Sequence, residues 1–337
     1  MRRLLISSLV VIAAACADDG PVAVSPSDPA AAGLGTPVDA SRNAIDIAVI
    51  GDVPYGSEAT SAFPAFIEGI NADPRVRRTV HVGDIKSGST VCSDEWFDFM
   101  RARLDDFADP LVYTPGDNEW TDCHRTNNGA YDPLERLARI REVFFDAPGS
   151  SLGRRTKRVL SQPGLPENQL WFESQVVFAA IHQVGSNNGL LPWTGLTEPT
   201  PAQLAEVDAR SAANREWLDE SFDLALDRDA RGVVLFVHAD MFRPGDTPAD
   251  VTGHQAFVEL MAERAGAYGG PVLLVVGDSH TYRELQPLVG TSAYGTFDVP
   301  NLTMIVVEES LRGDMGEWLR LTVDPGDPEV FSWERVR

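Results

Sequence analysis

The chain has 337 residues, of which 43% are hydrophobic and 23% charged, which is enough to bury one large core or two smaller ones and excludes general disorder. Lys and Arg number 28 against 50 Asp and Glu, so the formal net charge is −22. A surface this acidic repels polyanions, so we expect no nucleic-acid binding. Three cysteines are too few for a small disulfide-built fold, and they lack the C-x-x-C spacing of a structural zinc site.

The N-terminal segment has the pattern of an export signal. Two arginines precede an apolar run over residues 4–15, which suits a signal-peptide core and is too short to span a bilayer as a helix. Residues 1–16 are therefore predicted to be a signal peptide, with Cys16 as a lipidation position. Because Ala13 stands where Leu is usual before such a Cys, plain secretion and an incidental Cys16 are the alternatives. We expect a bacterial cell-envelope lipoprotein or a secreted protein, with membrane contact only through this anchor.

The next segment, residues 17–43, is rich in Pro, Ala, Gly, Ser and Asp and has no apolar periodicity. Such a segment cannot bury enough surface to order itself, so we predict a disordered tether. Residues 44–337 are predicted to form the folded domain. Without Cys16, the cysteines left are Cys92 and Cys123, an even pair in an oxidising compartment, which favours one disulfide over two buried free thiols.

After the tether, short apolar runs alternate with helical patterns, which predicts an α/β fold with sheets covered on both faces. The predicted strands are residues 45–50, 79–82, 111–114, 176–184, 233–237, 272–276, 302–307 and 319–323. A long helix is predicted over residues 201–226, with Leu204, Val207 and Trp217 facing the core. Two polar stretches, residues 166–168 and 185–189, are predicted to be turns.

Polar residues recur where the predicted strands end. Gly-Asp pairs follow four strands, at Asp52, Asp84, Asp117 and Asp278, and two histidines, His238 and His280, stand at the same kind of position. One Gly-Asp pair is usually only a turn. Loops that leave the carboxyl ends of strands converge on one crevice, however, and carboxylates that converge there need protons or bound cations. The two histidines favour cations.

The order of these motifs resembles the calcineurin-like metallophosphoesterase superfamily over Ile45 to about Pro287. Members carry, each after a strand, D-x-H, G-D, G-N-H-D/E, a lone His and G-H-x-H. The resemblance implies a four-layer α/β/β/α sandwich of two mixed sheets, two divalent metal ions, and hydrolysis of phosphate esters by a metal-activated water. It implies that Asp52 is the first ligand, Asp84 the carboxylate that bridges both ions, His238 the lone His and His280 the final His.

The motifs depart from the family pattern at several positions. Pro54 stands where the family has a metal-binding His, and Asp278 replaces the first His of the last motif. Asp117 takes the place of the ligand Asn, and Asn118 takes the place of the His that assists the leaving group. In the alternative register Asn118 is itself the ligand. His124 is the candidate replacement for the missing proton donor, and the alternative for it is a surface-loop His.

A set of four carboxylates and two imidazoles is oxygen-rich, so we predict two divalent ions with a manganese-like preference, with Mg, Ca, Fe or Zn as alternatives. Four carboxylates cancel the charge of two such ions. An anionic ester therefore needs further donors, for which Arg125, Arg243 and Arg283 are the candidates, against the alternative of solvated surface arginines. The predicted function is an exported, metal-dependent phosphoesterase acting on a small mono- or diester. The alternative is a non-catalytic, surface-tethered binding module that keeps the fold.

Overall fold

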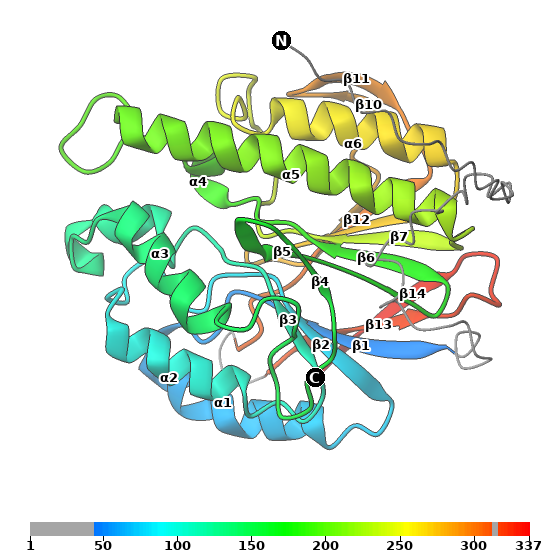
Figure 1. Ribbon diagram of the computed structural model, residues 1–337, viewed down its shortest axis with the longest axis horizontal. Helices are drawn as coiled ribbons and strands as arrows, with labels where there is room; N and C mark the ends of the chain where they lie inside the picture. The colour runs from blue at the N-terminus through cyan, green and yellow to red at the C-terminus, as the bar shows by residue number, and fades with distance from the viewer. Residues whose placement is uncertain (1–43, 312–315) are drawn as a thin grey trace, which may run out of the picture. The chain divides into compact units, whose positions relative to one another are not determined.

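The computed structural model describes residues 44–311 and 316–337. The predicted signal peptide, Cys16 and the tether lie outside the described residues and stay predictions. The strands form two large mixed sheets that face each other, and helices cover the outer face of each sheet (Figure 1). This arrangement is the four-layer α/β/β/α sandwich that the family resemblance implies.

The first sheet has the strand order β14-β13-β1-β2-β3. Its strands are β1 (Ile45–Ile50), β2 (Val76–His81), β3 (Leu111–Tyr113), β13 (Trp318–Val323) and β14 (Phe331–Val336). Its helices are α1 (Gly56–Asn71), α2 (Asp94–Leu104) and α3 (Pro133–Phe144), and two short 3-10 turns, η3 (Thr121–His124) and η4 (Thr126–Asn128), follow β3. Strands β1, β2 and β3 run parallel, so the loops after them emerge at one edge.

The second sheet has the order β4-β5-β6-β7-β8-β12-β9, and β6, β7, β8 and β12 run parallel. Its strands are β4 (Leu160–Gln162), β5 (Leu165–Glu173), β6 (Val176–Ala180), β7 (Gly232–Phe236), β8 (Val272–Val276), β9 (Arg283–Leu285) and β12 (Leu302–Val306). Its helices are α4 (Gly185–Gly189), α5 (Pro201–Asp227) and α6 (Gln255–Tyr268). A separate hairpin pairs β10 (Val289–Ser292) with β11 (Gly295–Asp298).

The core lies in three layers that correspond to the sandwich. Apolar side chains on the inner faces, such as Val80, Phe178 and Phe236, pack between the two sheets. The outer face of the first sheet packs on α1, α2 and α3, and that of the second sheet packs on α5 and α6. Both sheets are thus buried on both faces, which holds the strand ends of the two sheets in fixed positions relative to each other.

Three local predictions were wrong. Residues 166–168 lie inside β5 and form no turn, because Glu167 and Asn168 are buried and paired with side chains of α3 and α5. The strand predicted over residues 176–184 ends at Ala180. Leu204 in the first turns of α5 is 41% exposed, whereas Val207 and Trp217 are buried as predicted.

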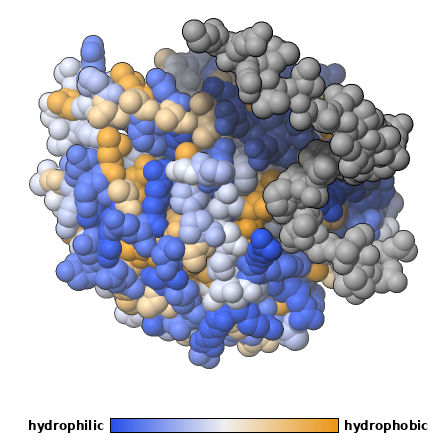
Figure 2. All heavy atoms as spheres, in the orientation of Figure 1, coloured by the Kyte–Doolittle hydropathy of each residue, from blue (hydrophilic) through white to orange (hydrophobic). Residues whose placement is uncertain are grey.

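Among the described residues, no helix combines the length and the apolar character that a membrane span needs. The face shown in Figure 2 is covered mainly by hydrophilic residues, with small apolar patches between them.

Candidate metal centre

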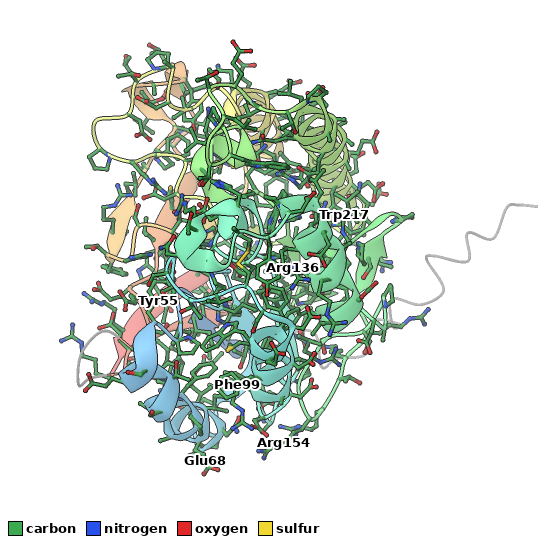
Figure 3. All side chains as sticks on the ribbon, turned by 90° about the vertical axis from the view of Figure 1, so that its left-hand side faces the viewer. Tyr55, Glu68, Phe99, Arg136, Arg154 and Trp217 are labelled. Atoms are coloured by element: carbon green, nitrogen blue, oxygen red, sulfur yellow. A yellow bond between two sulfur atoms is a disulfide. The ribbon has the colours of Figure 1, made fainter. Side chains whose placement is uncertain are left out.

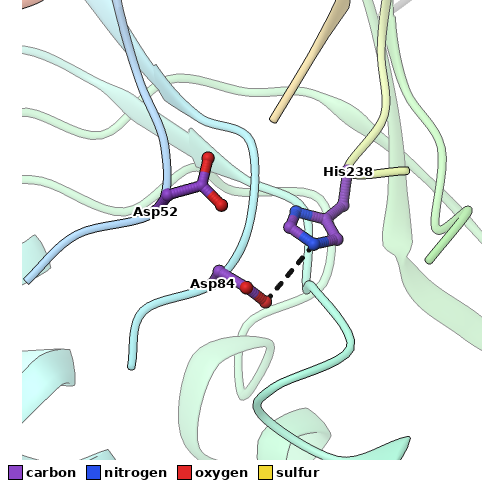
Figure 4. A group of neighbouring side chains, drawn as sticks. All are labelled: Asp52, Asp84 and His238. Atoms are coloured by element: carbon purple, nitrogen blue, oxygen red, sulfur yellow. Dashed lines mark ion pairs between the residues drawn. The ribbon is translucent and has the colours of Figure 1, made fainter. Parts of the chain in front are cut away.

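Ionisable side chains from both sheets meet at the carboxyl ends of the parallel strands. Asp52 follows β1, Asp84 follows β2 and His238 follows β7, and one ligand atom from each lies within 4.8 Å of the other two (Figure 4). Nε2 of His238 is 3.3 Å from Oδ1 of Asp84. A second group of the same kind joins His238 to Asp117 and Asp278. The convergence that the Gly-Asp pairs predict is therefore present in the structure.

The backbone at these positions is held in an uncommon conformation. Asp52, Asp84, Asp278 and His280 all have positive φ, at 54°, 59°, 72° and 59°. Non-glycine residues rarely adopt this left-handed region, and such strain gathers at functional sites. Close packing accompanies it: a Cβ added at Gly116 would lie 2.1 Å from Oδ1 of Asp84, so only glycine fits there.

The imidazole of His238 is oriented by the first sheet. Its Nδ1 lies 2.8 Å from the carbonyl oxygen of Val82 and donates to it, so Nε2, which faces the carboxylates, is the ring nitrogen that a metal ion could use. A single ring nitrogen with one lone pair binds one ion. His238 belongs to both groups of candidate ligands, but it can serve only one ion at a time.

The two carboxylate oxygens of Asp84 face different neighbours. Oδ1 lies beside His238 and accepts from the backbone N–H of Asn118 at 3.1 Å. Oδ2 accepts from the hydroxyl of Tyr55 at 2.6 Å and from the side-chain amide of Asn118. Both oxygens of Asp84 are therefore held in fixed directions by their neighbours.

The carboxylates of the cluster are buried close to one another, which makes their charge costly. Burial, opposed by His238 and reinforced by Asp117 and other acids, raises the pKa of Asp84 well above its ordinary value, and burial together with Asp117 raises that of Asp278 to about 6. Burial would lower the pKa of His238, but the surrounding carboxylates, Asp84 first, raise it well above the ordinary range. Carboxylates whose charge is this costly are suited to binding a cation.

Tyr55, directly before α1, is a site residue that the sequence analysis missed (Figure 3). Its hydroxyl lies 2.6 Å from Asp84, 3.3 Å from Asp52 and 3.4 Å from Nε2 of His280, and it accepts from the amide of Asn118 at 3.3 Å. The phenol oxygen thus occupies the space between the candidate ligands. Its position one residue after Pro54, in the loop that follows the first Gly-Asp pair, was the available signal.

Lys86 was also missed, although it follows the second Gly-Asp pair. Its side chain is fully buried, and Nζ donates to the carbonyl oxygen of Asn118 at 2.8 Å and to that of Ser87 at 2.9 Å. Burial lowers its pKa to about 8, against the opposing effect of Glu119 and Asp84. Lys86 adds positive charge beside the acidic cluster.

The cleft over the cluster has a volume of about 400 Å³, and Arg125 and Arg243 line it. Arg125 pairs with Asp122 at 2.7 Å and Arg243 pairs with Asp278, and both guanidinium side chains are more than 40% exposed. Arg283 pairs instead with Asp240 and donates to the carbonyl oxygen of Phe242. The structure therefore brings two of the three predicted arginines to the cleft.

The remaining predicted residues lie as follows. Asp117 and Asn118 both reach the cluster, since Asp117 contacts His238 and Asn118 contacts Asp84. A polar group is therefore present whether Asp117 or Asn118 corresponds to the ligand Asn of the family motif. Nδ1 of His124 accepts from the backbone N–H of Thr194 at 2.9 Å, and its ring stacks on Trp193. His124 therefore packs on the loop of residues 190–200, and its role as a proton donor stays a prediction.

The predicted disulfide is confirmed. Cys92 and Cys123 are bonded, with their Cα atoms 5.9 Å apart, and the bond is visible in Figure 3. It links the segment after the Asp84 loop to η3, which follows Asp117. Such a link constrains the unfolded chain and keeps these two loops in register.

No protein-family profile matches the chain, and comparison with curated proteins finds no match. Similar solved structures include GAP50, the anchor in the inner membrane complex of Plasmodium, at 10% identity and a TM-score of 0.47, covering 87% of this chain and 89% of that one. A purple acid phosphatase from yellow lupin (Lupinus luteus) seeds matches at 10% identity and a TM-score of 0.44, covering 87% of this chain and 53% of that one. A Staphylococcus aureus protein assigned as a 5'-nucleotidase, in complex with alpha-ketoglutarate, matches at 14% identity and a TM-score of 0.41. This match covers 87% of this chain and 53% of that one. The chain spans about half the length of the last two proteins.

Proposed function

We propose that this protein is an exported, metal-dependent phosphoesterase that hydrolyses a phosphate mono- or diester with water. The observation that carries the proposal is the meeting of buried carboxylates from both sheets around His238. The order of the motifs along the chain, which resembles the metallophosphoesterase pattern, supports the same conclusion. The acidic surface and its two cleft arginines favour a small ester over a polyanion.

The donor set fits two divalent ions. Asp52, Asp84 and His280, with the Tyr55 hydroxyl between them, offer one set of ligands. Asp84, Asp117, His238 and Asp278 offer the other, and Asp84 is common to both sets. Carboxylate and phenol oxygens outnumber imidazole nitrogens, so we expect Mn²⁺ to be preferred over Zn²⁺, with Mg²⁺, Ca²⁺ and Fe as alternatives. Such ions polarise a phosphoryl oxygen and lower the pKa of water.

The chain's own residues would bind and orient the ester. Arg243 is held at the cleft by its ion pair with Asp278, and Arg125 by its ion pair with Asp122, and their exposed N–H groups can bind phosphate oxygens. The Asn118 amide also lines this cleft, and the Tyr55 hydroxyl lies 3.3 Å from it. We expect the two arginines and the Asn118 amide to position the phosphate.

A second candidate function is a non-catalytic, surface-tethered module that binds a metal ion or an anion. Specific observations favour it: Pro54 offers no ligand atom, and Asn118 has no proton to give at neutral pH. In addition, His124 turns its Nδ1 toward Thr194. A phosphoesterase with this site would depend on a leaving group that departs without a proton from the protein.

An assay of metal-dependent turnover distinguishes the two functions. Disulfide-intact protein is stripped of metal, and hydrolysis of p-nitrophenyl phosphate and bis-p-nitrophenyl phosphate is measured with and without added Mn²⁺. We expect turnover only with metal, and none in Asp84→Asn purified in the same way. Metal binding without turnover of either ester would favour the binding module. Equal turnover in Asp84→Asn would show that the activity does not belong to this site.

A further inference from the structure

The short turn α4 (Gly185–Gly189), which follows β6, has a backbone of the wrong hand for a helix of L-residues. Three consecutive non-glycine residues, Ser186, Asn187 and Asn188, have φ of 52°, 53° and 57° and ψ between 33° and 49°. Asn tolerates the left-handed region better than other non-glycine residues, but Ser does not, and a run of three such residues is rare. Such a turn persists only where the surrounding structure holds it in place.

Buried side chains from α5 and the loop before α6 hold this turn. Arg210, whose side chain is 1% exposed, donates to the carbonyl oxygen of Asn188 at 3.0 Å and also to its side chain. Asn188 donates in turn to the carbonyl oxygen of Gly253 at 3.0 Å. Glu206 fixes the guanidinium of Arg210 at 2.7 Å. These contacts with α5 and the loop before α6 therefore determine the shape of the turn.

The turn delivers one hydroxyl to the acidic cluster. Oγ of Ser186 lies 2.8 Å from Oδ2 of Asp117 and 3.0 Å from Oδ1 of Asp122. The other oxygen of Asp117, Oδ1, lies 3.2 Å from Nε2 of His238. The backbone also comes close, since a Cβ added at Gly185 would lie 2.6 Å from Oδ2 of Asp117. Ser186 and Gly185 together fix which oxygen of Asp117 faces His238.

We propose that Ser186 is a positioning residue for Asp117, which it turns so that Oδ1 is presented to the metal shared with His238. This inference rests on the proposed function, because it requires that Asp117 binds metal. A carboxylate with one oxygen engaged by a neutral donor keeps its charge and loses rotational freedom, both of which favour metal binding. Hydrogen bonds of this kind to a ligand typically change metal affinity about 10- to 100-fold.

Two substitutions separate the hydroxyl from the strained backbone. Ser186→Gly removes the hydroxyl and relieves the left-handed strain, whereas Ser186→Ala removes the hydroxyl and keeps the strain. Ala130→Gly is the matched control, because Ala130 is an exposed residue with φ of 54° outside the cleft. It relieves the same kind of strain and leaves Ser186 in place.

The experiment uses the full chain with its disulfide intact. Mn²⁺ is titrated into metal-stripped wild type and the three variants by calorimetry, and the melting temperature of each metal-free protein is measured. We expect both Ser186 variants to bind Mn²⁺ about tenfold or more weakly than the wild type, and Ala130→Gly to bind it equally well. The metal-free Ser186→Gly protein should melt at or above the wild-type temperature, and Ser186→Ala below Ser186→Gly.

The outcomes separate this inference from the proposed function. If the wild type binds Mn²⁺ and both Ser186 variants bind it equally well, the positioning role is overturned and the proposed function stands. If only Ser186→Gly binds weakly, the backbone and not the hydroxyl positions Asp117, which also overturns the inference. If the wild type itself does not bind Mn²⁺, the proposed function fails and the inference fails with it.

Discussion

Two groups of buried acidic side chains in this protein differ in how their charge is balanced. Glu167 in β5 lies 2.6 Å from Arg141 of α3 and 3.0 Å from His182. Although burial alone would raise its pKa, the hydrogen bond to His182 and the ion pair with Arg141 lower it to about 2. Asp84 is equally buried and lies beside His238, but burial and the nearby acids, Asp117 first, raise its pKa well above the ordinary value. The partners of Glu167 lower its pKa, whereas the surroundings of Asp84 raise the pKa of that carboxyl.

The comparison indicates what each group is for. A buried charge with partners inside the chain contributes to the structure, and removing one partner is costly. A buried acid that lies among other acids is costly to ionise in the protein alone, and a bound cation would offset that cost. The Glu167 group should therefore control stability, and the Asp84 group should control binding and turnover.

The largest expected effect is on turnover in Asp84→Asn. This substitution removes the carboxylate that both sets of candidate ligands share, so we expect phosphoesterase activity to fall by roughly 10³-fold or more. The metal-free variant should be no less stable than the wild type, because a buried like charge is removed. Initial rates with Mn²⁺ and thermal melts without it measure the two effects. Asp98→Asn, at an exposed position on α2, is the control that should leave both unchanged.

The second largest effect is expected on the stability of the Glu167→Gln variant. Because Arg141 and His182 lose their buried partner, we expect the free energy of unfolding to fall by about 3 kcal/mol. Mn²⁺ affinity of the folded variant should match the wild type. Denaturant unfolding and Mn²⁺ titration give the two values. Glu142→Gln is the control, because it removes an exposed partner of Arg139 on α3 and should lower the free energy of unfolding by about 0.5 kcal/mol or less. A similar loss of stability in both variants would contradict the distinction between the two groups.

The stability difference between wild type and Glu167→Gln should depend on pH. The folded pKa of Glu167 is lowered from 4.5 to about 2, so the unfolded chain takes up a proton at a higher pH than the folded one. The stabilisation is therefore fully present above about pH 4.5 and is lost as pH falls toward 2, by about 1.4 kcal/mol per pH unit at most. Unfolding of both proteins across this range should show the difference narrowing, whereas a constant difference would mean that Glu167 is not held ionised.

The smallest of these effects is expected for Tyr55→Phe. The variant keeps the ring and loses the hydroxyl that donates to Asp84 at 2.6 Å. A hydrogen bond to a charged group contributes about 1.5 to 3 kcal/mol, so we expect catalytic efficiency with Mn²⁺ to fall by roughly 10- to 100-fold. Tyr131→Phe, on the loop before α3, is the control. Unchanged efficiency in Tyr55→Phe would show that the hydroxyl contacts neither metal nor substrate when the site is complete.

The sequence predicts the frame of this site better than its details. Asp52 and Asp84 follow neighbouring parallel strands of the first sheet, so the meeting of these two carboxylates could be foreseen. His238 follows β7 of the second sheet, and it reaches them because the two sheets pack face to face. For Tyr55 the sequence offered only its position in the loop after the first Gly-Asp pair, and the role of Ser186 could not be foreseen, because it depends on a left-handed turn that only packing against distant residues defines. Glu167 was taken for part of a turn for the same reason. Its partners come from a helix and a strand end that no local pattern connects to it.

Anomalous diffraction can show whether Asp84 and His238 share bound metal. Crystals of the disulfide-intact protein are soaked in Mn²⁺ and measured near the manganese absorption edge. We expect anomalous peaks within coordination distance of Asp84, with one of them also at Nε2 of His238. Full occupancy of Mn²⁺ elsewhere on the protein, with no peak between these side chains, would contradict this expectation.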